Sequence, residues 1–440
     1  MQLITNKQKD KKTKQTIAQK LAMASCSLIA ATSPVSAKTS LLDDIKVDAA
    51  IMYYGEQDRV QAIEGITNVQ KAFGDNSLLD VKLVWDALTG ASASGAVAQN
   101  SAQTFTRPSG NGEYTINAGD TPLDDTFRDT RVQLSGNWTE ILTSQWTISG
   151  GLYGSKEYDY TSFGANGGIE LGLNKDNTTL SLSGSYTHDK LDPVGGKPVP
   201  LSAMAIRKDF ANEDAFQTAF DQTRNGDSET KDTGDMLLGI TQILSQRWLM
   251  QANYGLSSVS GYLTDPYKIL SVVDSNGNAT KYRYEHRPDS RLKHSGFILA
   301  KGALSSGIVD FSYRYSTDDW DINSHTLETH YRHYFTPSFY GQLHLRYYLQ
   351  DAANFYQPFL LEGTSLPEYA SADYRIGDMS AYTVGLKAGY KFTNGHKMTY
   401  RLEYYQQDPD NNGVELVGQL KDQDLFPSVK SVIFQVGYSF

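Results

Sequence analysis

The chain has 440 residues, 39% of them hydrophobic, and a formal net charge of −10 at pH 7. This acidic balance argues against nucleic acid as a partner, because binding to the phosphate backbone needs basic surfaces. No stretch approaches the roughly 18 consecutive apolar residues of a transmembrane helix, which excludes a helical membrane protein.

The N-terminal segment predicts a cleaved secretory signal over residues 1–37. Lysines precede a short apolar run, and Val35 and Ala37 provide the small residues of a signal-peptidase site. A lipoprotein signal acylated at Cys26 is a poorer match, because most of the apolar run follows the cysteine. The segment holds six Lys and one Asp of the 40 basic and 50 acidic residues, so residues 38–440 keep 34 basic and 49 acidic residues and no Cys.

Beyond the signal, apolar and polar residues alternate with the period of two that strands require. The clearest example is 324–350, which reads as two strands around a Thr-Pro-Ser turn. Leu327 and Tyr331 share one face of its first strand, and Glu328 and Arg332 share the other. A tilted strand of about ten residues crosses a bilayer, so this pattern predicts a hairpin of a transmembrane β-barrel.

The same pattern recurs along the chain with connectors that alternate between tight turns and mostly long loops. We expect an all-β fold, a transmembrane antiparallel up-and-down barrel of about 16 strands that fills 38–440, with short periplasmic turns and long outer loops. The alternation is weakest at 59–73, which could instead be a loop. The predicted strands are 46–56, 59–73, 78–88, 129–141, 145–156, 160–173, 178–188, 233–244, 247–260, 291–304, 307–317, 324–335, 339–350, 378–392, 397–407 and 429–440.

Two further observations favour a barrel over a secreted β-sandwich or solenoid. A sandwich has no reason to separate short from long connectors, and no fixed-period repeat supports a solenoid. The chain also ends in an amphipathic strand closed by Phe440, similar to the signal that the outer-membrane assembly machinery reads, although Gln435 stands where that signal usually has Gly. We therefore expect a bacterial outer-membrane protein whose partners are lipid and the assembly machinery, and whose last strand pairs with its first.

The outer loops contain two predicted elements of their own. Phenylalanines among polar residues in 203–223 indicate a short helix. A turn at 274–278 predicts a small hairpin that pairs 268–273 with 280–284.

The alternation turns a set of charged side chains toward the lumen. One interpretation is a charged ladder that orients ions or a polar solute in a pore. The other is a set of cross-strand ion pairs that hold the wall and fill the lumen. The candidates are Arg314, Glu328, His330, Arg332, His344, Arg346, Arg401 and Glu403.

A second group lies at the outer rim: Asp318, Asp319, Asp321 and His325. Carboxylate and histidine groups at a rim can activate water, as surface proteases of the omptin type do. These residues do not form an omptin motif, and the chain has neither a Gly-x-Ser-x-Gly elbow nor a His-Glu-x-x-His site. We therefore expect no enzyme, no catalytic residue, no metal site and no cofactor.

Four segments, which we call the loop phrases, have more specific sequences than solvated loops need: 85–92, 261–268, 285–291 and 373–378. They resemble a family of bacterial outer-membrane β-barrels known as a domain of unknown function, over nearly the whole mature chain. Ser94, or its neighbour Ala93, stands where that family has Pro.

The resemblance implies genes for a periplasmic flavin transferase, a thioredoxin-like protein and a small lipoprotein beside this one. It thus implies a small lipoprotein or a periplasmic redox protein as partner, and it supplies no catalytic residues. Our first hypothesis is a channel, export or envelope component linked to a periplasmic redox or flavin system. The alternatives are a plugged barrel that acts as receptor or scaffold, and a rim hydrolase. The sequence indicates neither an open lumen nor an oligomeric state.

Overall fold

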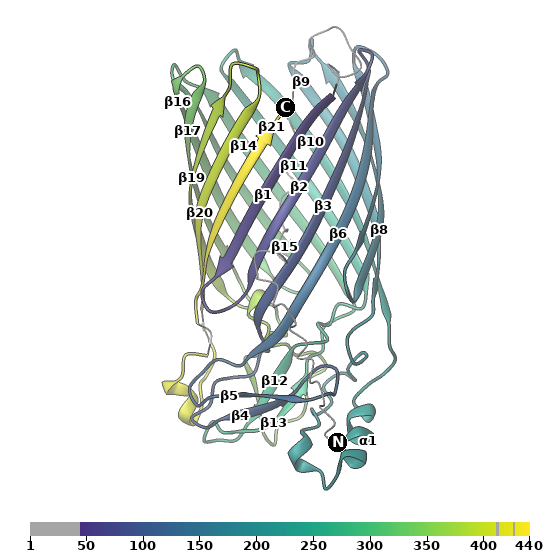
Figure 1. The fold of residues 1–440 in the computed structure, drawn as a ribbon, viewed down its shortest axis with the longest axis vertical. Coiled ribbons are helices and arrows are strands. Elements are labelled where there is room, and N and C mark those ends of the chain that lie inside the picture. The colour runs from purple at the N-terminus through teal and green to yellow at the C-terminus, as the bar shows by residue number, and fades with distance from the viewer. Residues whose placement is uncertain (1–44, 411–412, 426) are drawn as a thin grey trace, which may run out of the picture.

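The computed structural model describes residues 45–410, 413–425 and 427–440, so the predicted signal at 1–37 lies outside the described residues. Within them, sixteen antiparallel strands close into a barrel (Figure 1). These are β1 (Ile45–Glu56), β2 (Gln61–Phe73), β3 (Ser77–Ala93), β6 (Leu123–Ile141), β7 (Trp146–Lys156), β8 (Tyr160–Leu173), β9 (Thr178–Leu191), β10 (Glu229–Ser245), β11 (Trp248–Gly261), β14 (Ser290–Ala303), β15 (Gly307–Asp318), β16 (Asn323–Thr336), β17 (Phe339–Gln350), β19 (Met379–Lys391), β20 (Lys397–Pro409) and β21 (Val429–Ser439).

The barrel closes where β1 pairs with β21, with Ile51 opposite Val436. Closure removes both sheet edges, so no row of backbone groups is left without a partner strand. The fold class predicted from the alternation is therefore confirmed. The doubtful segment 59–73 contains a true barrel strand, since β2 pairs with β3 along its whole length and with β1 from Gln61 to Lys71.

The predicted strand ends differ most at β3 and β6. The sequence predicted 78–88 and 129–141, whereas β3 extends to Ala93 and β6 begins at Leu123. The two strands continue to pair with each other beyond the alternating part, across a register shift between Gly90 and Ser92. That pairing joins segments far apart in the sequence, and the alternation of apolar and polar residues alone does not predict it.

The outward face of the barrel is apolar. Side chains that alternate along the strands are exposed on it, including Leu152 with 71% and Leu386 with 63% of their surface accessible. Aromatic side chains gather near both ends of the strands, for example Phe335 and Phe339 beside the tight turn of β16 and β17, and Tyr315 and Tyr347 toward the other end. An apolar band between two aromatic belts is typical of a membrane-spanning barrel.

The long connections fold together at the end of the barrel opposite the tight turns (Figure 1). We call this assembly the cap; it comprises 94–122, 192–228, 262–289, 351–378 and 413–425. Its elements are β4 (Gln103–Thr106), β5 (Glu113–Ile116), β12 (Ile269–Val273), β13 (Ala279–Tyr284), β18 (Phe359–Leu361), α1 (Glu213–Gln222), and the 3-10 helices η2 (Arg207–Asp209), η3 (Tyr374–Ile376) and η4 (Gly418–Asp422).

Both elements predicted in the loops are present. The helix expected within 203–223 is α1, which Asn212 caps by accepting a hydrogen bond from the Ala215 amide. The expected hairpin is β12–β13, to which β18 adds a third strand. In the described part of the chain, helices are too short or too polar to cross a bilayer.

Most of the deeply buried apolar side chains lie in the cap rather than in the barrel. Leu270 and Val273 of β12, Phe105 of β4 and Phe216 of α1 have no accessible surface. They belong to separate small clusters, in which residues from distant loops pack together. The cap is thus a folded body with its own cores, and not a set of solvated loops.

Candidate functional site: a polar lumen beneath a folded cap

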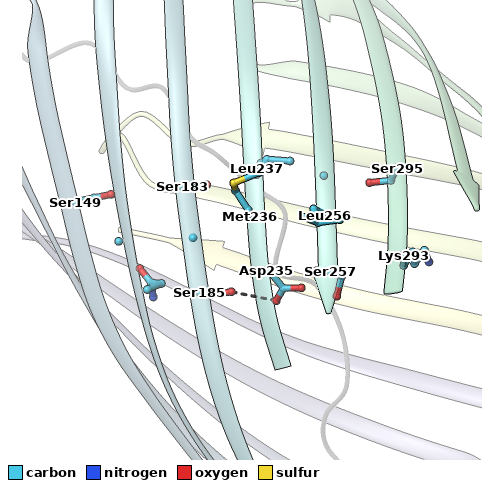
Figure 2. A pocket seen from close by; sticks show the side chains of 14 residues that line it. Ser149, Ser183, Ser185, Asp235, Met236, Leu237, Leu256, Ser257, Lys293 and Ser295 are labelled. Atoms are coloured by element: carbon cyan, nitrogen blue, oxygen red, sulfur yellow. Dashed lines mark hydrogen bonds between the residues drawn. The ribbon is translucent and has the colours of Figure 1, made fainter. Parts of the chain in front are cut away.

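One half of the lumen wall carries small polar side chains and is hollow. Strands β7 to β11 and β14 border a space of about 570 Å³ (Figure 2). Ser183 and Ser185 point into it because Leu182 and Tyr186 of the same strand face outward. Ser185 donates a hydrogen bond to Asp235, 3.1 Å away. Small side chains leave this side of the lumen open to water.

The other half of the lumen is filled by larger and charged side chains. Met52, Glu64 and Val84, on β1 to β3, are almost fully buried although they lie on the inner face of the wall. Arg131 of β6 forms an ion pair with Asp86 of β3. The lumen is therefore asymmetric, hollow beside β7 to β11 and β14 and filled beside β1 to β3.

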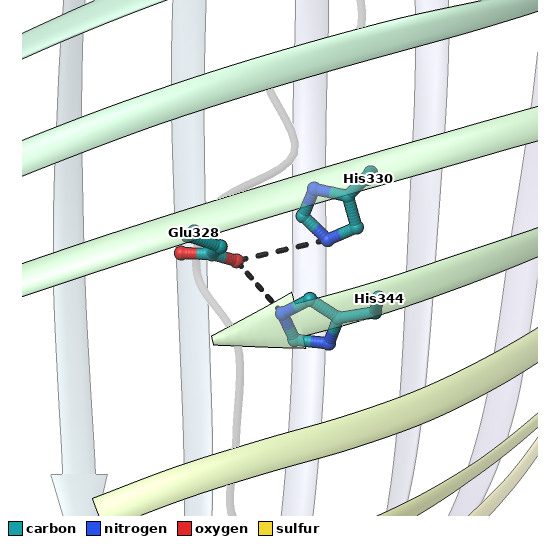
Figure 3. A group of neighbouring side chains, drawn as sticks. All are labelled: Glu328, His330 and His344. Carbon is teal, nitrogen blue, oxygen red and sulfur yellow. Dashed lines mark hydrogen bonds and ion pairs between the residues drawn. The ribbon is translucent and has the colours of Figure 1, made fainter. Parts of the chain in front are cut away.

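The charged candidates predicted for the lumen follow β15, β16, β17 and β20. At their centre, His330 of β16 lies opposite His344 of β17, and the two rings stack with centroids 4.3 Å apart (Figure 3). Glu328 Oε1 lies 3.1 Å from His344 Nε2 and 3.6 Å from His330 Nε2. Glu403 Oε1 lies 3.0 Å from His344 Nδ1.

The arginines surround this cluster with different partners. Arg332 donates two hydrogen bonds to Gln342 Oε1, at 2.9 and 2.8 Å, and its guanidinium lies over the Tyr340 ring. Arg401 lies 3.6 Å from Glu403 Oε2. The wall thus contains both ion pairs and amide contacts.

Arg346 and Arg314 are placed by aromatic rings of the inner face. Arg346 is paired in register with Glu328 and lies 5.8 Å from the Tyr348 ring. Arg314 lies 5.2 Å from the Phe297 ring and is exposed in the lumen. These two cations remain accessible to whatever fills the lumen.

The rim candidates do not form one group. Asp318 is buried at the end of β15, accepts a hydrogen bond from Arg291 Nε at 2.8 Å, and also accepts the backbone amides of Trp320 and Ile322. His325 lies on the outward face of β16, where Tyr313 is 2.8 Å from its Nδ1. Asp318 shapes the turn, and His325 belongs to the aromatic belt.

The other two rim carboxylates also hold local structure. Asp319 accepts the Leu292 amide at 3.0 Å, and Asp321 accepts a hydrogen bond from Asn354 at 3.0 Å. The structure therefore does not assemble these residues around a common water position.

A buried ionic network in the cap was not predicted. Arg287 donates to Glu285 at 2.6 Å and to Asp373 at 2.8 Å, and the side chains of both acids have no accessible surface. Arg375 extends the network, donating to Asp373 at 2.5 Å and to Asp265 at 2.6 Å. A buried charge is stable only when it is paired and hydrogen-bonded, and here every acid has an arginine.

The network consists of the loop phrases that the sequence singled out. Asp265 and Lys268 come from 261–268, Glu285 and Arg287 from 285–291, and Asp373 and Arg375 from 373–378. Lys268 also donates to the Ala93 carbonyl, beside 85–92. Three of the phrases carry an acid with a base two or three positions away, and the fourth ends at Ser92, beside Ala93. The spacing of acid and base can be seen in the sequence, but it does not indicate that the four phrases come into contact in the fold.

Burial and charge shift the acids of this network in opposite directions. Burial raises the pKa of Glu285 to about 6, although Arg287 opposes the shift. Burial would also raise the pKa of Asp373, but Arg375, Lys268 and Arg287 together hold it below its usual range. Lys268 and Arg375 likewise outweigh burial at Asp265 and lower its pKa.

The cap spans the mouth of the barrel. Asp265 binds Arg375 in the β17–β19 connection, while Tyr267 donates a hydrogen bond to Asp159 in the β7–β8 connection. In ring order β8 is the sixth strand and β19 the fourteenth, eight positions apart in a ring of sixteen. The two connections therefore start from opposite sides of the barrel, and 265–267 contacts both of them over its mouth.

These features define the class of the protein: a closed β-barrel of the outer-membrane type, with an apolar outer wall, a polar lumen and a folded cap. The family model described as "Protein of unknown function (DUF3570)" matches residues 18–440, and the chain belongs to this family. This agrees with the resemblance that the four loop phrases carry. None of the curated proteins compared with the chain matches it.

Among solved structures, the chain is similar to a bacterial polysaccharide outer membrane secretin, with 9% identity over 90% of this chain and 98% of the other and a TM-score of 0.44. It is also similar to the toluene transporter TodX of Pseudomonas putida, with 10% identity, coverage of 90% and 89%, and a TM-score of 0.37. A third is OccK2 (OpdF) of Pseudomonas aeruginosa in complex with glucuronate, with 13% identity, coverage of 91% and 99%, and a TM-score of 0.40.

Proposed function

We propose that the protein is a bacterial outer-membrane channel that passes small polar solutes along the hollow half of its lumen, with the cap as a gate at the outer mouth. The apolar outer wall and its aromatic belts support the membrane location. The barrel strands, of 11 to 19 residues, exceed the roughly 9–11 residues that a tilted strand needs to cross the bilayer. The tight turns then face the periplasm.

The space of about 570 Å³ beside Ser183, Ser185 and Asp235 is the observation that carries the proposal. Hydroxyl groups and a carboxylate exchange hydrogen bonds with water and with polar solutes, and the small side chains leave room for both. The bridge across the mouth argues for passage that depends on movement of the cap. Association with a small lipoprotein or a periplasmic redox protein stays a prediction from the family resemblance.

Planar-bilayer recordings test the proposal with two barrels: the complete chain, and a variant in which residues 263–288 are replaced by a short Gly-Ser turn. We expect brief, infrequent openings from the complete chain and sustained conductance from the variant, because the bridge across the mouth is gone. Absence of conductance from both would contradict a channel. Equal, steady conductance from both would contradict the gate.

A pair of substitutions on one strand locates the path. Ser183→Trp places a large ring in the hollow, so the conductance of the cap-deleted barrel should fall severalfold. Leu182→Trp is the matched control, because its neighbouring position faces outward and should leave the conductance unchanged. An equal response of the two variants would contradict passage along this side.

The second candidate function is a capped receptor or scaffold. The observation that favours it is the cap itself, whose buried cores and ionic network hold the outer surface in one arrangement. If both barrels prove silent in bilayers, crosslinking in whole cells followed by purification should retain a stoichiometric partner on the cap.

A further inference from the structure

Two imidazole nitrogens and a carboxylate oxygen converge inside the lumen. The Nε2 atoms of His330 and His344 both face Oε1 of Glu328, and the three ligand atoms lie within 4.8 Å of one another (Figure 3). The residues lie on two adjacent paired strands, with His330 directly opposite His344. Paired backbones fix the spacing of the three side chains, so the cluster is built into the wall.

A second layer of carboxylates orients both rings. Asp310 Oδ1 lies 2.9 Å from His330 Nδ1, and Glu403 Oε1 lies 3.0 Å from His344 Nδ1. A carboxylate at Nδ1 accepts the proton of that nitrogen, which leaves the lone pair on Nε2. Histidines that bind metals carry this arrangement, in which the carboxylate fixes the tautomer and raises the basicity of the ligand.

This orientation leaves three acceptors facing one another. When both rings are neutral, two Nε2 lone pairs and a carboxylate oxygen face one another, which is a ligand set for a cation. In the absence of an ion, a proton on His344 can fill the same role, with Glu403 and Glu328 as acceptors at its two nitrogens. One divalent ion accepts all three lone pairs at once.

The cluster is accessible from the lumen. The side chains of Glu328, His330 and His344 retain 33%, 28% and 15% of their accessible surface. His330 lies near the middle of β16, about halfway between the rim and the tight turn. An ion that enters the lumen can therefore reach the three ligands.

The donor set selects the class of metal. Imidazole nitrogen with one carboxylate suits Zn²⁺ and neighbouring transition metals, whereas Ca²⁺ and Mg²⁺ take oxygen ligands. Three protein ligands leave at least one coordination position of a tetrahedral ion open for water or an anion.

We propose that Glu328, His330 and His344 bind one divalent transition-metal ion of the Zn²⁺ class within the barrel, with Asp310 and Glu403 orienting the two imidazoles. The site goes beyond the passage of polar solutes and does not require it. It is an alternative to the sequence prediction that there is no metal site.

Titration calorimetry of the folded, tag-free full-length barrel in detergent tests the site, with ZnCl₂ added after removal of metal by a chelator. We expect one Zn²⁺ per chain in the wild type and no saturable binding in His330→Gln/His344→Gln. Glu403→Gln should weaken binding about 10–100-fold, as loss of an orienting carboxylate does at other metal sites. CaCl₂ should give no saturable binding.

His333→Gln is the matched control, because His333 lies on the same strand, faces outward and packs against Phe335. It should bind Zn²⁺ like the wild type. Heat-modifiable migration in gels checks that each variant is folded. For Cu²⁺, electron paramagnetic resonance should show coupling to two nitrogens in the wild type and in His333→Gln.

Absence of stoichiometric Zn²⁺ binding to the folded wild-type barrel would overturn the proposal, as would unchanged binding in the double variant. The binding measurement uses detergent-solubilised protein without a membrane. A barrel that conducts but binds no metal, or binds metal but does not conduct, therefore separates this inference from the proposed channel.

Discussion

The barrel wall exposes its apolar side chains on its outer face, whereas the cap buries its apolar side chains in its interior. In the wall, Leu386 and Leu402 are more than half exposed on the outer face, whereas in the cap Leu270 and Phe105 have no accessible surface. Both regions contain paired strands, so backbone hydrogen bonding does not distinguish them. The difference is the one expected if the apolar face of the wall meets lipid, whereas the cap buries its apolar side chains in cores of its own.

The polar groups of the two regions differ in the same way. Some charged residues of the wall, such as Arg314 and Glu328, remain partly accessible in the lumen, although others, such as Glu64, are buried. Glu285 and Asp373 of the cap are completely enclosed and depend on Arg287. Loss of Arg287 should therefore matter far more than loss of an accessible wall cation such as Arg314.

The largest expected effect is that of Arg287→Ala in the cap. The substitution leaves Glu285 and Asp373 buried without their shared cation, and removing one partner of a buried pair costs about 3–5 kcal/mol. Hydrogen exchange followed by mass spectrometry should show faster exchange of peptides from 262–289, while peptides from the barrel strands remain protected. Equal loss of protection in both regions would show that cap and wall unfold as one unit.

Lys281→Ala is the control for this prediction. Lys281 and Glu362 form an exposed ion pair at 3.8 Å, and such pairs contribute about 0–1 kcal/mol. Exchange of the same peptides should be nearly unchanged.

A somewhat smaller effect should follow from truncation of a cap core residue. Leu270→Ala removes a fully buried side chain and should destabilise the cap by about 2–5 kcal/mol. Leu402→Ala removes the same group from the outer wall and should leave exchange in the cap unaltered, because the two sites share no packing. A response of the cap to Leu402→Ala would contradict the independence of the two regions.

The fold was predictable because each barrel strand carries its own signal. Alternation in 324–350 fixes which side chains face outward, and connector length separates the two ends of the barrel. The prediction of strands from the sequence was incomplete where the pairing is long-range. The examples are the ends of β3 and β6, and the cap, where β18 from a distant loop pairs with β12. A period of two cannot report which distant segments meet.

The candidate site was predictable only in part, for the same reason. Glu328, His330 and His344 were each expected in the lumen, and a hairpin around the Thr-Pro-Ser turn places His330 opposite His344. The orientation of the two imidazoles also depends on Asp310 from β15 and Glu403 from β20, which β16 and β17 do not specify. The rim carboxylates do not form one group because Asp318, Asp319 and Asp321 each hold different local structure in and around the β15–β16 turn.

The smallest expected effect concerns the dependence of cap stability on pH. The pKa of Glu285 is raised to about 6, because the fold favours its neutral form. Its contribution to the free energy of unfolding of the cap is therefore complete below its ordinary pKa and is lost as the pH rises through 6. Asp373 and Asp265 have lowered pKa values, because the fold favours their ionised forms. Their contribution to cap stability is therefore present above their ordinary pKa and is lost as the pH falls below about 4. Cap stability should therefore rise by at most about 2 kcal/mol from pH 7 to 5 and decrease below pH 4.

Urea titrations followed by the fluorescence of Trp320, which packs against Phe355 of the cap, measure this profile. Trp320→Phe identifies the part of the signal that belongs to this residue. Glu285→Gln should abolish the rise between pH 7 and 5 and keep the loss below pH 4, because only the carboxyl that titrates near 6 has been removed. If the rise in cap stability persists in Glu285→Gln, it belongs to another titrating group. A flat profile in the wild type would contradict an ionised Glu285 in the buried network.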